Sequence, residues 1–150
     1  MNKVTFLTLG ALVVSSQLIA QRTPHVPGSV QRSFQRDYPE ARDQQWTFAH
    51  RSWHANFEDH SRYDRGEMVA NYDRYGNHID SYVPYDNNDV PQEVIDRTRR
   101  NYPDGRDYTY TRIERPHGRP LFQISLNLRN VNRTIYTDER GHAYRYHGRQ

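Results

Sequence analysis

Hydrophobic positions along this chain follow two periods in turn, first about four residues and then two, and the whole progression occurs twice. The four-residue spacing falls on these positions: Val26, Val30, Phe34 and Tyr38, and then Val90, Val94, Thr98 and Tyr102. Such spacing places one stripe along one face of a helix. Pro27 and Pro91 suit the first helical position, where a fixed φ fits and the missing N–H costs nothing. Each stretch ends in Tyr-Pro, which predicts the end of a helix, because the residue before proline is pushed out of the helical region.

After each predicted helix, apolar residues alternate with polar ones, which is typical of strands with one buried face. In the first half the alternating residues are Trp46, Phe48, Trp53, Ala55, Phe57, Met68, Ala70, Tyr72, Ile79 and Val83. Polar or glycine-bearing breaks at 51–52, 61–66 and 74–77 predict hairpins between them. In the second half the pattern predicts strands at 108–114, 121–128, 132–137 and 142–147, with a turn at 117–120. Each half is therefore predicted to be one helix followed by four antiparallel strands.

The two halves share ordered landmarks at a nearly constant offset, which is the signature of a duplicated unit. Val-Pro occurs at 26 and 90, Tyr-Pro at 38 and 102, and Asp-x-x-Gly at 73 and 138, while Trp46 falls on Tyr110. We therefore predict an α+β fold of two tandem repeats, each a helix plus a four-stranded antiparallel sheet. The predicted boundaries are an N-terminal tail at 21–25, a first repeat at 26–84, a linker at 85–89 and a second repeat at 90–147. A unit of about 60 residues is marginally stable alone, so we expect the copies to pack together or to share one sheet.

The predicted linker is rich in aspartate and asparagine, reading Tyr-Asp-Asn-Asn-Asp at 85–89. Side-chain oxygens of these types are ligands that calcium takes. The same residue types also form turns and cap helices. We favour turns and caps, because these are the more frequent roles of aspartate and asparagine.

Residues 1–20 have the layout of a secretory signal peptide, with Lys3 in a short polar start, an apolar run at 4–18, and the small residue Ala20 at the end. Polar residues interrupt the run, which is short for a membrane span of roughly 20 apolar residues. We therefore predict cleavage after Ala20 and no transmembrane segment in what remains. The predicted location is the periplasm or the outside of the cell.

The amino-acid composition excludes thiol chemistry and disfavours nucleic-acid binding. The absence of cysteine (Cys 0) excludes a disulfide framework, a lipid-modified cysteine and a thiol nucleophile. The 12 tyrosines and 2 tryptophans supply rings that bury a large apolar area in a core without disulfides. The formal net charge falls by one, from +3 to +2, when Lys3 leaves with the signal, and the arginines are interleaved with acidic residues. This mixture is typical of a hydrated surface and disfavours nucleic acid as a partner.

The Val-Pro step, the amphipathic helix, the Tyr-Pro step, a tryptophan in the next strand and the Asp-x-x-Gly turn together resemble the PepSY-like proteins, which are related in fold to the beta-lactamase inhibitor protein. The resemblance covers nearly all of 26–147. The first half fits better, because in the second half Tyr110 replaces the tryptophan and Thr98 replaces the large helical residue. The resemblance implies an exported bacterial protein with helices on one side of a sheet and the other face open to a partner. Protease propeptide segments and inhibitors are among the fold relatives, so protein binding is the function implied, with no inhibitory residue assigned.

The sheet face turned away from the predicted helices is expected to be polar. It would display His54, Asn56, Glu58, Glu67, Asn71, Asp80 and Tyr82 from the first half, and Gln123, Ser125, Asn127, Asn132, Thr134, Tyr136 and Arg145 from the second. The simplest interpretation is a hydrated surface, since antiparallel sheets commonly have one wet side. The functional interpretation is a shallow recognition surface, because tyrosine and arginine are enriched at binding hot spots. We predict that Tyr82, Tyr136 and Arg145 contribute to binding.

Metal binding and catalysis have weaker support in the sequence. His50, His54 and His60 form the densest group of histidines. On one straight strand His50 and His54 would lie about 13 Å apart, too far to share an ion, although a hairpin at 51–52 would bring them closer. Motifs such as Gly-x-Ser-x-Gly and His-Glu-x-x-His do not occur. We predict no metal ligands, no cofactor and no catalytic residues.

These observations predict an exported, non-catalytic binding protein of PepSY-like type whose partner is a protein, with inhibition of a hydrolase as one form of that function. The alternative is a structural or stress-related envelope protein that binds a small molecule or a glycan. A stoichiometric protein partner in an envelope extract would distinguish the first from the second. The identity of the partner and the oligomeric state are left open by the sequence.

Overall fold

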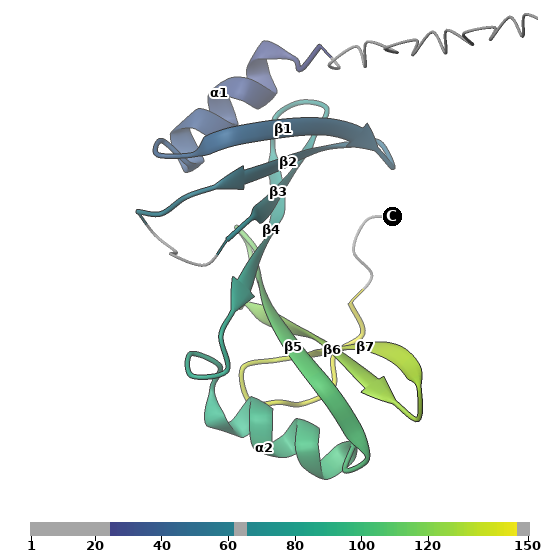
Figure 1. The fold of residues 1–150 in the computed structure, drawn as a ribbon. Coiled ribbons are helices and arrows are strands. Elements are labelled where there is room, and N and C mark those ends of the chain that lie inside the picture. Colours follow the sequence, from purple (N-terminus) through teal and green to yellow (C-terminus); the bar gives the residue numbers. More distant parts are fainter. Residues whose placement is uncertain (1–24, 62–65, 147–150) are drawn as a thin grey trace, which may run out of the picture.

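The computed structural model describes residues 25–61 and 66–146, in which the chain forms two helices and seven strands (Figure 1). In chain order these elements are α1 (Gly28–Asp37), β1 (Arg42–Ala49), β2 (Ser52–Glu58), β3 (Met68–Asp73), β4 (His78–Tyr85), α2 (Gln92–Asn101), β5 (Gly105–Glu114), β6 (Leu121–Leu128) and β7 (Val131–Thr137). All seven strands belong to one antiparallel sheet in the order β1-β2-β3-β4-β5-β6-β7. The predicted signal peptide at 1–20 and most of the predicted tail lie outside the described residues.

The prediction of two tandem repeats, each a helix plus a four-stranded sheet, is wrong, because the strands form a single seven-stranded sheet. β4 pairs with β5 from Ser81 to Tyr85, so the strands that would have been edges of two small sheets satisfy each other's backbone groups. The predicted last strand at 142–147 does not form in its described part. Its backbone pairs with β7 at a single bridge, between Thr137 and Ala143, and after this bridge the chain leaves the sheet.

Both helices begin and end in the same way. α1 starts after Pro27 and α2 after Pro91, with φ and ψ of −57° and 140° at Pro27 and −52° and 131° at Pro91. The sequence predicts these prolines at the first helical position, but each lies one residue before it, at the N-cap. At the other end the backbone N–H of Tyr38 donates to Phe34 O at 2.7 Å, and that of Tyr102 donates to Thr98 O at 2.9 Å. The predicted ends at Tyr-Pro are confirmed.

The turns after β3 and β7 are also built alike. Asp73 Oδ1 accepts the backbone N–H groups of Tyr75 at 2.8 Å and Asn77 at 2.9 Å. Asp138 Oδ1 accepts the corresponding groups of Arg140 at 2.9 Å and His142 at 2.8 Å. Burial pushes the pKa of each carboxyl upward, but these hydrogen bonds to the charged form outweigh it, so both pKa values lie below the usual 3.8.

A cluster of aromatic rings forms the core between α1 and the first strands. Phe34 is at its centre, with ring centroids 4.9 Å from Phe57, 5.1 Å from Trp46 and 6.3 Å from Tyr72. Most of these contacts are edge to face, the arrangement that the charge distribution of aromatic rings favours. The helix-facing side of this half is therefore filled by rings.

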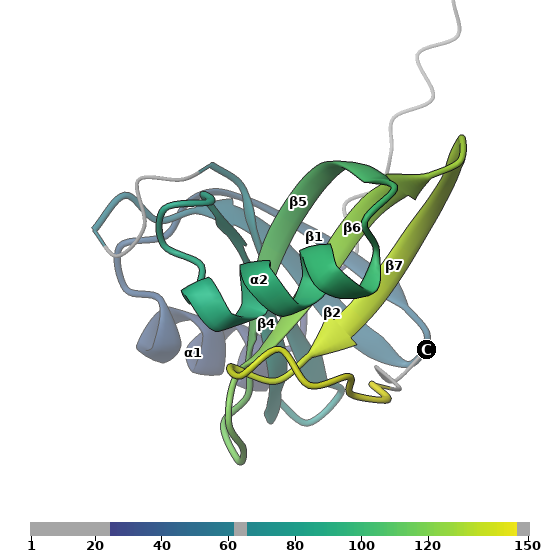
Figure 2. The same cartoon turned by 90° about the horizontal axis from the view of Figure 1, so that it is seen from below.

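A second, smaller core with fewer aromatic rings lies beneath α2, which crosses β5, β6 and β7 (Figure 2). Its buried residues are Val90, Val94, Ile95, Tyr110, Phe122 and Ile124. Tyr85 packs against both cores and pairs with Tyr110, so the two helices cover the same face of the sheet. The opposite face has no helix in the described part of the chain.

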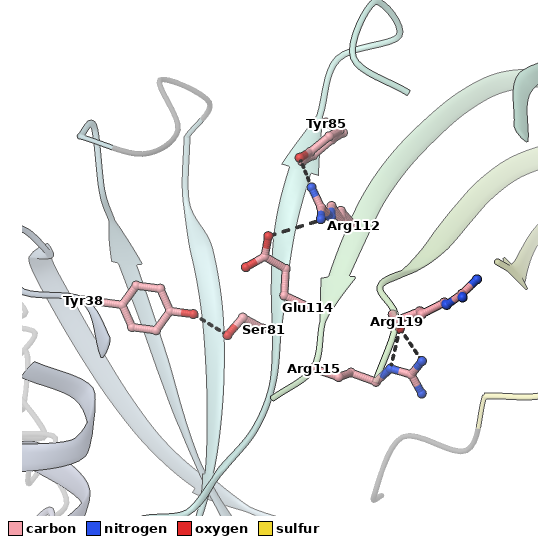
Figure 3. Close-up of polar contacts among 7 residues, drawn as sticks. All are labelled: Tyr38, Ser81, Tyr85, Arg112, Glu114, Arg115 and Arg119. Atoms are coloured by element: carbon pink, nitrogen blue, oxygen red, sulfur yellow. Dashed lines mark hydrogen bonds and ion pairs between the residues drawn. The ribbon is translucent and has the colours of Figure 1, made fainter. Parts of the chain in front are cut away.

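Polar contacts connect the two halves where β4 meets β5 (Figure 3). Arg112 Nη1 on β5 donates to the Tyr85 hydroxyl at 2.8 Å, and Arg112 Nε lies 3.8 Å from Glu114 Oε1. On the same strand β4, Ser81 Oγ shares a buried hydrogen bond of 2.5 Å with the Tyr38 hydroxyl at the end of α1. The junction is thus part of the folded interior and not a flexible joint between two units.

Candidate binding face

The helix-free face of the sheet is hollow, with a cavity volume of about 820 Å³. We call this hollow the concave face. It is lined by residues from β2 to β7 and from the last described residues, among them His54, Asn71, Asp80, Tyr82, Thr111, Gln123, Tyr136 and Tyr146. The hollow therefore spans the junction between the two halves, and neither half makes it alone.

A carboxylate and three tyrosines form the centre of the concave face. Asp80 on β4 is buried, and its Oδ1 accepts a hydrogen bond of 2.6 Å from Asn71 Nδ2 on β3. Its second oxygen, Oδ2, accepts a hydrogen bond from the hydroxyl of Tyr146. The ring of Tyr146 packs against Tyr136 on β7, with centroids 5.3 Å apart. Tyr82, two residues beyond Asp80, completes the cluster.

The surroundings of Tyr82 and Tyr146 raise the pKa of both phenols. Burial, together with the negative charge of Asp80, raises the pKa of Tyr82 to about 12. Burial and the hydrogen bond to Asp80 raise the pKa of Tyr146 as well. Both shifts follow from the cost of a phenolate in a poorly solvated place beside a carboxylate. At neutral pH the cluster offers hydroxyl groups and ring surface, with Asp80 as its acidic group.

The C-terminal segment is joined to β7 by one backbone bridge and reaches the concave face through one side chain. In the bridge between Thr137 and Ala143, the Tyr144 N–H donates to Tyr136 O at 2.8 Å. Further along the segment, the Tyr146 hydroxyl donates to Asp80 Oδ2 on β4. The last described residues thus form part of the wall of the hollow.

The structure brings Tyr82 and Tyr136 together in the concave face, as the sequence predicts. Arg145 is exposed and is not among the residues that line the hollow. Sequence reasoning missed Tyr146, which takes the place expected of Arg145. Strand alternation put Arg145 on the polar face, and the alternation does not apply where the strand does not form.

His50 and His54 both line the rim of the concave face, brought there by the turn between β1 and β2. His54 Nε2 lies 3.1 Å from Ala49 O and 3.2 Å from Ser52 Oγ, so this ring is held by the turn. His60 interacts instead with Glu58, at 3.2 Å. Within 25–61 and 66–146 the structure has no group of three or more His, Cys, Asp or Glu side chains that could hold a metal ion.

The chemistry of the concave face suits recognition by hydrogen bonds and ring contacts. Asn71 Oδ1 is buried and makes no hydrogen bond to another described residue, while Asn71 Nδ2 donates to Asp80. Tyrosine rings provide rigid contact area with little loss of conformational entropy. Such a combination can bind and orient a partner.

No helix in the described part of the chain is long and apolar enough to cross a membrane.

Comparisons with solved structures show the fold. A DUF2874 family protein from Bacteroides uniformis ATCC 8492 superposes with a TM-score of 0.71 at 17% sequence identity, over 79% of this chain and 86% of that one. A protein from Bacteroides eggerthii DSM 20697, provisionally described as periplasmic, gives a TM-score of 0.72 at 18% identity, over 81% and 88%. A BLIP-like protein from Bacteroides fragilis NCTC 9343 gives 0.68 at 16% identity, over 79% and 83%. The chain therefore has a BLIP-like fold.

No protein-family model and no curated protein sequence matches this chain.

Proposed function

We propose that the chain is an exported, non-catalytic binding protein that holds a partner protein in its concave face. The observation that carries the proposal is the hollow of about 820 Å³ on the helix-free side of the sheet, with Tyr82, Tyr136 and Tyr146 around the buried Asp80. Aromatic residues grouped near the centre of a surface and close to desolvated polar groups are the usual anchors of protein interfaces. A segment of a partner that enters the hollow would meet ring surface and hydrogen-bonding groups together.

The comparisons support this proposal at the level of the fold. One structural neighbour is BLIP-like, and another is provisionally described as periplasmic. Fold similarity alone does not transfer an activity. We propose in addition that the chain is a PepSY-like protein, on the motifs of its sequence, and that it is exported to the periplasm or secreted, on the signal-like residues 1–20.

Site-specific photocrosslinking tests the proposal directly. A photoreactive phenylalanine analogue is placed at Tyr82 or at Tyr136, and the full chain is irradiated in an envelope extract of the cells that produce it. The matched control carries the same analogue at Arg32, which is exposed on α1. We expect a discrete adduct of one partner protein from the two concave-face positions and not from the helix position.

Adducts of equal yield from all three positions, or from Arg32 alone, would show that the concave face is not the binding surface. A concave face that yields no protein adduct would favour the alternative of an envelope protein that binds a small molecule or a glycan. If the captured partner is a hydrolase, its activity measured with and without the purified chain decides whether binding is inhibitory.

A further inference from the structure

The concave face is acidic, although the chain as a whole is basic. Its lining has two carboxylates, Asp80 on β4 and Glu67 directly before β3. None of the lining residues within 25–61 and 66–146 is a lysine or an arginine. The whole chain has the opposite balance, with 21 lysines and arginines against 18 aspartates and glutamates. A chain with an excess of basic residues therefore has an acidic hollow.

Arginines line other hollows of the surface. Arg97, Arg100 and Arg140 line one next to α2 and the turn that follows β7. Arg106 and Arg129 line another, where β5 begins and β6 ends. Each of these hollows also contains acidic residues, so its charges are mixed. The separation of carboxylates from arginines is thus a property of the concave face and not of every hollow on this chain.

Asp80 is a carboxylate whose hydrogen-bond partners are neutral. Both of its oxygens accept hydrogen bonds, one from Asn71 Nδ2 and one from the Tyr146 hydroxyl, which is the pattern of an ionised carboxylate. Asp80 forms no ion pair with a residue of the described ranges. A negative charge in a poorly solvated place is stabilised by a nearby cation. The concave face therefore supplies a charge that a basic group on a ligand can neutralise.

A ligand in the hollow would contact tyrosine rings and meet the charge of Asp80 from a short distance. Asp80 is only 3% exposed, whereas Tyr82, Tyr136 and Tyr146 are partly exposed in the wall. The face of a tyrosine ring attracts a cation, and the attraction is stronger where water is excluded. A cleft lined by one sign of charge also focuses the electric field of that charge. The rings and the carboxylate thus favour the same kind of ligand, a cation.

We propose that the concave face takes a basic side chain, lysine or arginine, from a segment of the partner protein. This inference rests on the proposed function and adds the chemistry of the partner to it. Glu67 is exposed and supplies a second carboxylate to the same hollow. The volume of about 820 Å³ exceeds that of a single side chain, so residues on either side of the basic one enter with it.

Peptides that differ in one side chain test the role of the charge. The probes are acetyl-Gly-Ala-X-Ala-Gly-amide with arginine, lysine, citrulline or glutamate at X, and citrulline has nearly the shape of arginine without its charge. Each is titrated into the isotope-labelled full chain at low salt, and binding is followed by backbone amide NMR. We expect saturable shifts centred on Asn71, Asp80, Tyr82 and Tyr136. The arginine or the lysine peptide should bind about tenfold more tightly than the citrulline peptide, and added salt should weaken only the charged peptides.

Variants of the two carboxylates locate the effect. Asp80→Asn keeps the shape of the side chain and removes its charge, so it should weaken the arginine peptide about tenfold and leave the citrulline peptide unchanged. Glu67→Gln should weaken the arginine peptide about threefold, because the charge of an exposed residue is screened. Glu40→Gln is the matched control and should bind like the native chain, since it removes a carboxylate from an exposed position between α1 and β1.

Circular dichroism and the melting temperature establish that each variant is folded. If Asp80→Asn does not fold, Tyr136→Leu takes its place. It should weaken the arginine peptide more than the citrulline peptide, because leucine has no ring face to attract a cation. Equal weakening of the two peptides would contradict the proposal.

A citrulline or glutamate peptide bound as tightly as the arginine peptide would overturn the proposal, as would shifts centred on α2 or the absence of saturable binding. Butylguanidine bound as tightly as the arginine peptide would also overturn it, because the hollow would then take a free cation and not a partner segment. The crosslinking experiment decides the proposed function separately. A partner captured at Tyr82 and Tyr136, together with equal binding of the arginine and citrulline peptides, would leave the proposed function standing and remove the basic side chain.

Discussion

The two halves of this sheet share a backbone framework and differ in what fills it. Both helices follow a proline, both end at a tyrosine, and both strands β3 and β7 lead into the same aspartate-centred turn. The first half packs α1 on a cluster of rings around Phe34, whereas the second places Thr98 at the matched position. The comparison teaches that a few capping and turn residues maintain the frame, while the side chains packed inside it can change in size and kind.

The largest expected effect comes from emptying the ring cluster. Phe34→Ala removes a buried ring and leaves a cavity, so it should lower the free energy of unfolding by about 4 kcal/mol. Thr98→Ala at the matched position should change it by about 1 kcal/mol or less, because the side chain is small and its hydroxyl has no partner among the described residues. Chemical denaturation of both variants measures the difference. Equal losses would contradict the contrast between the two cores.

Replacing the turn glycines should have an intermediate effect that is similar in the two halves. Gly76 and Gly141 have φ of 93° and 73°, in the region that favours glycine, and an added Cβ would come within 3 Å of a helix carbonyl in each case. Gly76→Ala and Gly141→Ala should each cost about 2 kcal/mol. Thermal unfolding checks this, with Gly118→Ala in the β5–β6 turn as the control. A large cost at only one of the two glycines would show that the turns are not equivalent.

Acid should weaken both turns. The pKa values of Asp73 and Asp138 lie below the usual 3.8, so near that pH the unfolded chain takes up protons before the folded one. The stability that these carboxylates contribute is therefore present above 3.8 and is lost as the pH falls through the folded pKa. Denaturation between pH 5 and about 2 should show a shallower loss in Asp73→Asn and Asp138→Asn, because asparagine does not titrate. Variants that lose stability as steeply as the native chain would contradict the role of the two carboxylates.

The smallest expected effect is a change in the pH dependence of stability that comes from His78, a residue of the first half whose matched residue in the second half is Ala143. Burial lowers the pKa of His78 below its ordinary 6.5, so below that pH the unfolded chain binds a proton that the folded chain does not. Stability should therefore be constant above 6.5 with respect to this group and should decline as the pH falls below it. His78→Gln should reduce the decline between pH 7 and 5, while Ala143→Gln at the matched position should leave it as it is. A native-like decline in His78→Gln would show that another group is responsible.

The local elements were predictable because each depends on neighbouring residues. The four-residue spacing and the Tyr-Pro steps located both helices, and the alternation at 121–128 located β6 with its bounds. A shared sheet was one of the two arrangements expected from the small size of each half, and the structure has it. Which strands join, β4 with β5, and in which register, was not predictable, because local alternation carries no information on long-range strand pairing. The strand predicted at 142–147 failed for a related reason. Its alternating residues fit a strand, but the chain turns toward Asp80 after one bridge.

The candidate site was predictable only in part. Alternation placed Tyr82 and Tyr136 on the helix-free face, and the structure sets both in the hollow. Whether Arg145 or Tyr146 lies on the helix-free face depended on whether residues 142–146 form a strand. The hydrogen bond between Tyr146 and Asp80 joins positions far apart in the chain, and no local pattern marks it. The sequence shows Thr98 in place of a large residue, but the hollow that Thr98 and Thr137 line between α2 and β7 was not predicted, because it depends on the fold.

The most direct test of the concave face as the binding surface is hydrogen–deuterium exchange of the full chain with and without the partner captured by crosslinking. Bound partner should slow exchange in β3, β4 and β7, the strands that carry Asn71, Asp80, Tyr82 and Tyr136, and should leave α1 and α2 unchanged. Slowed exchange confined to the helices, or to the edge strand β1, would contradict the account.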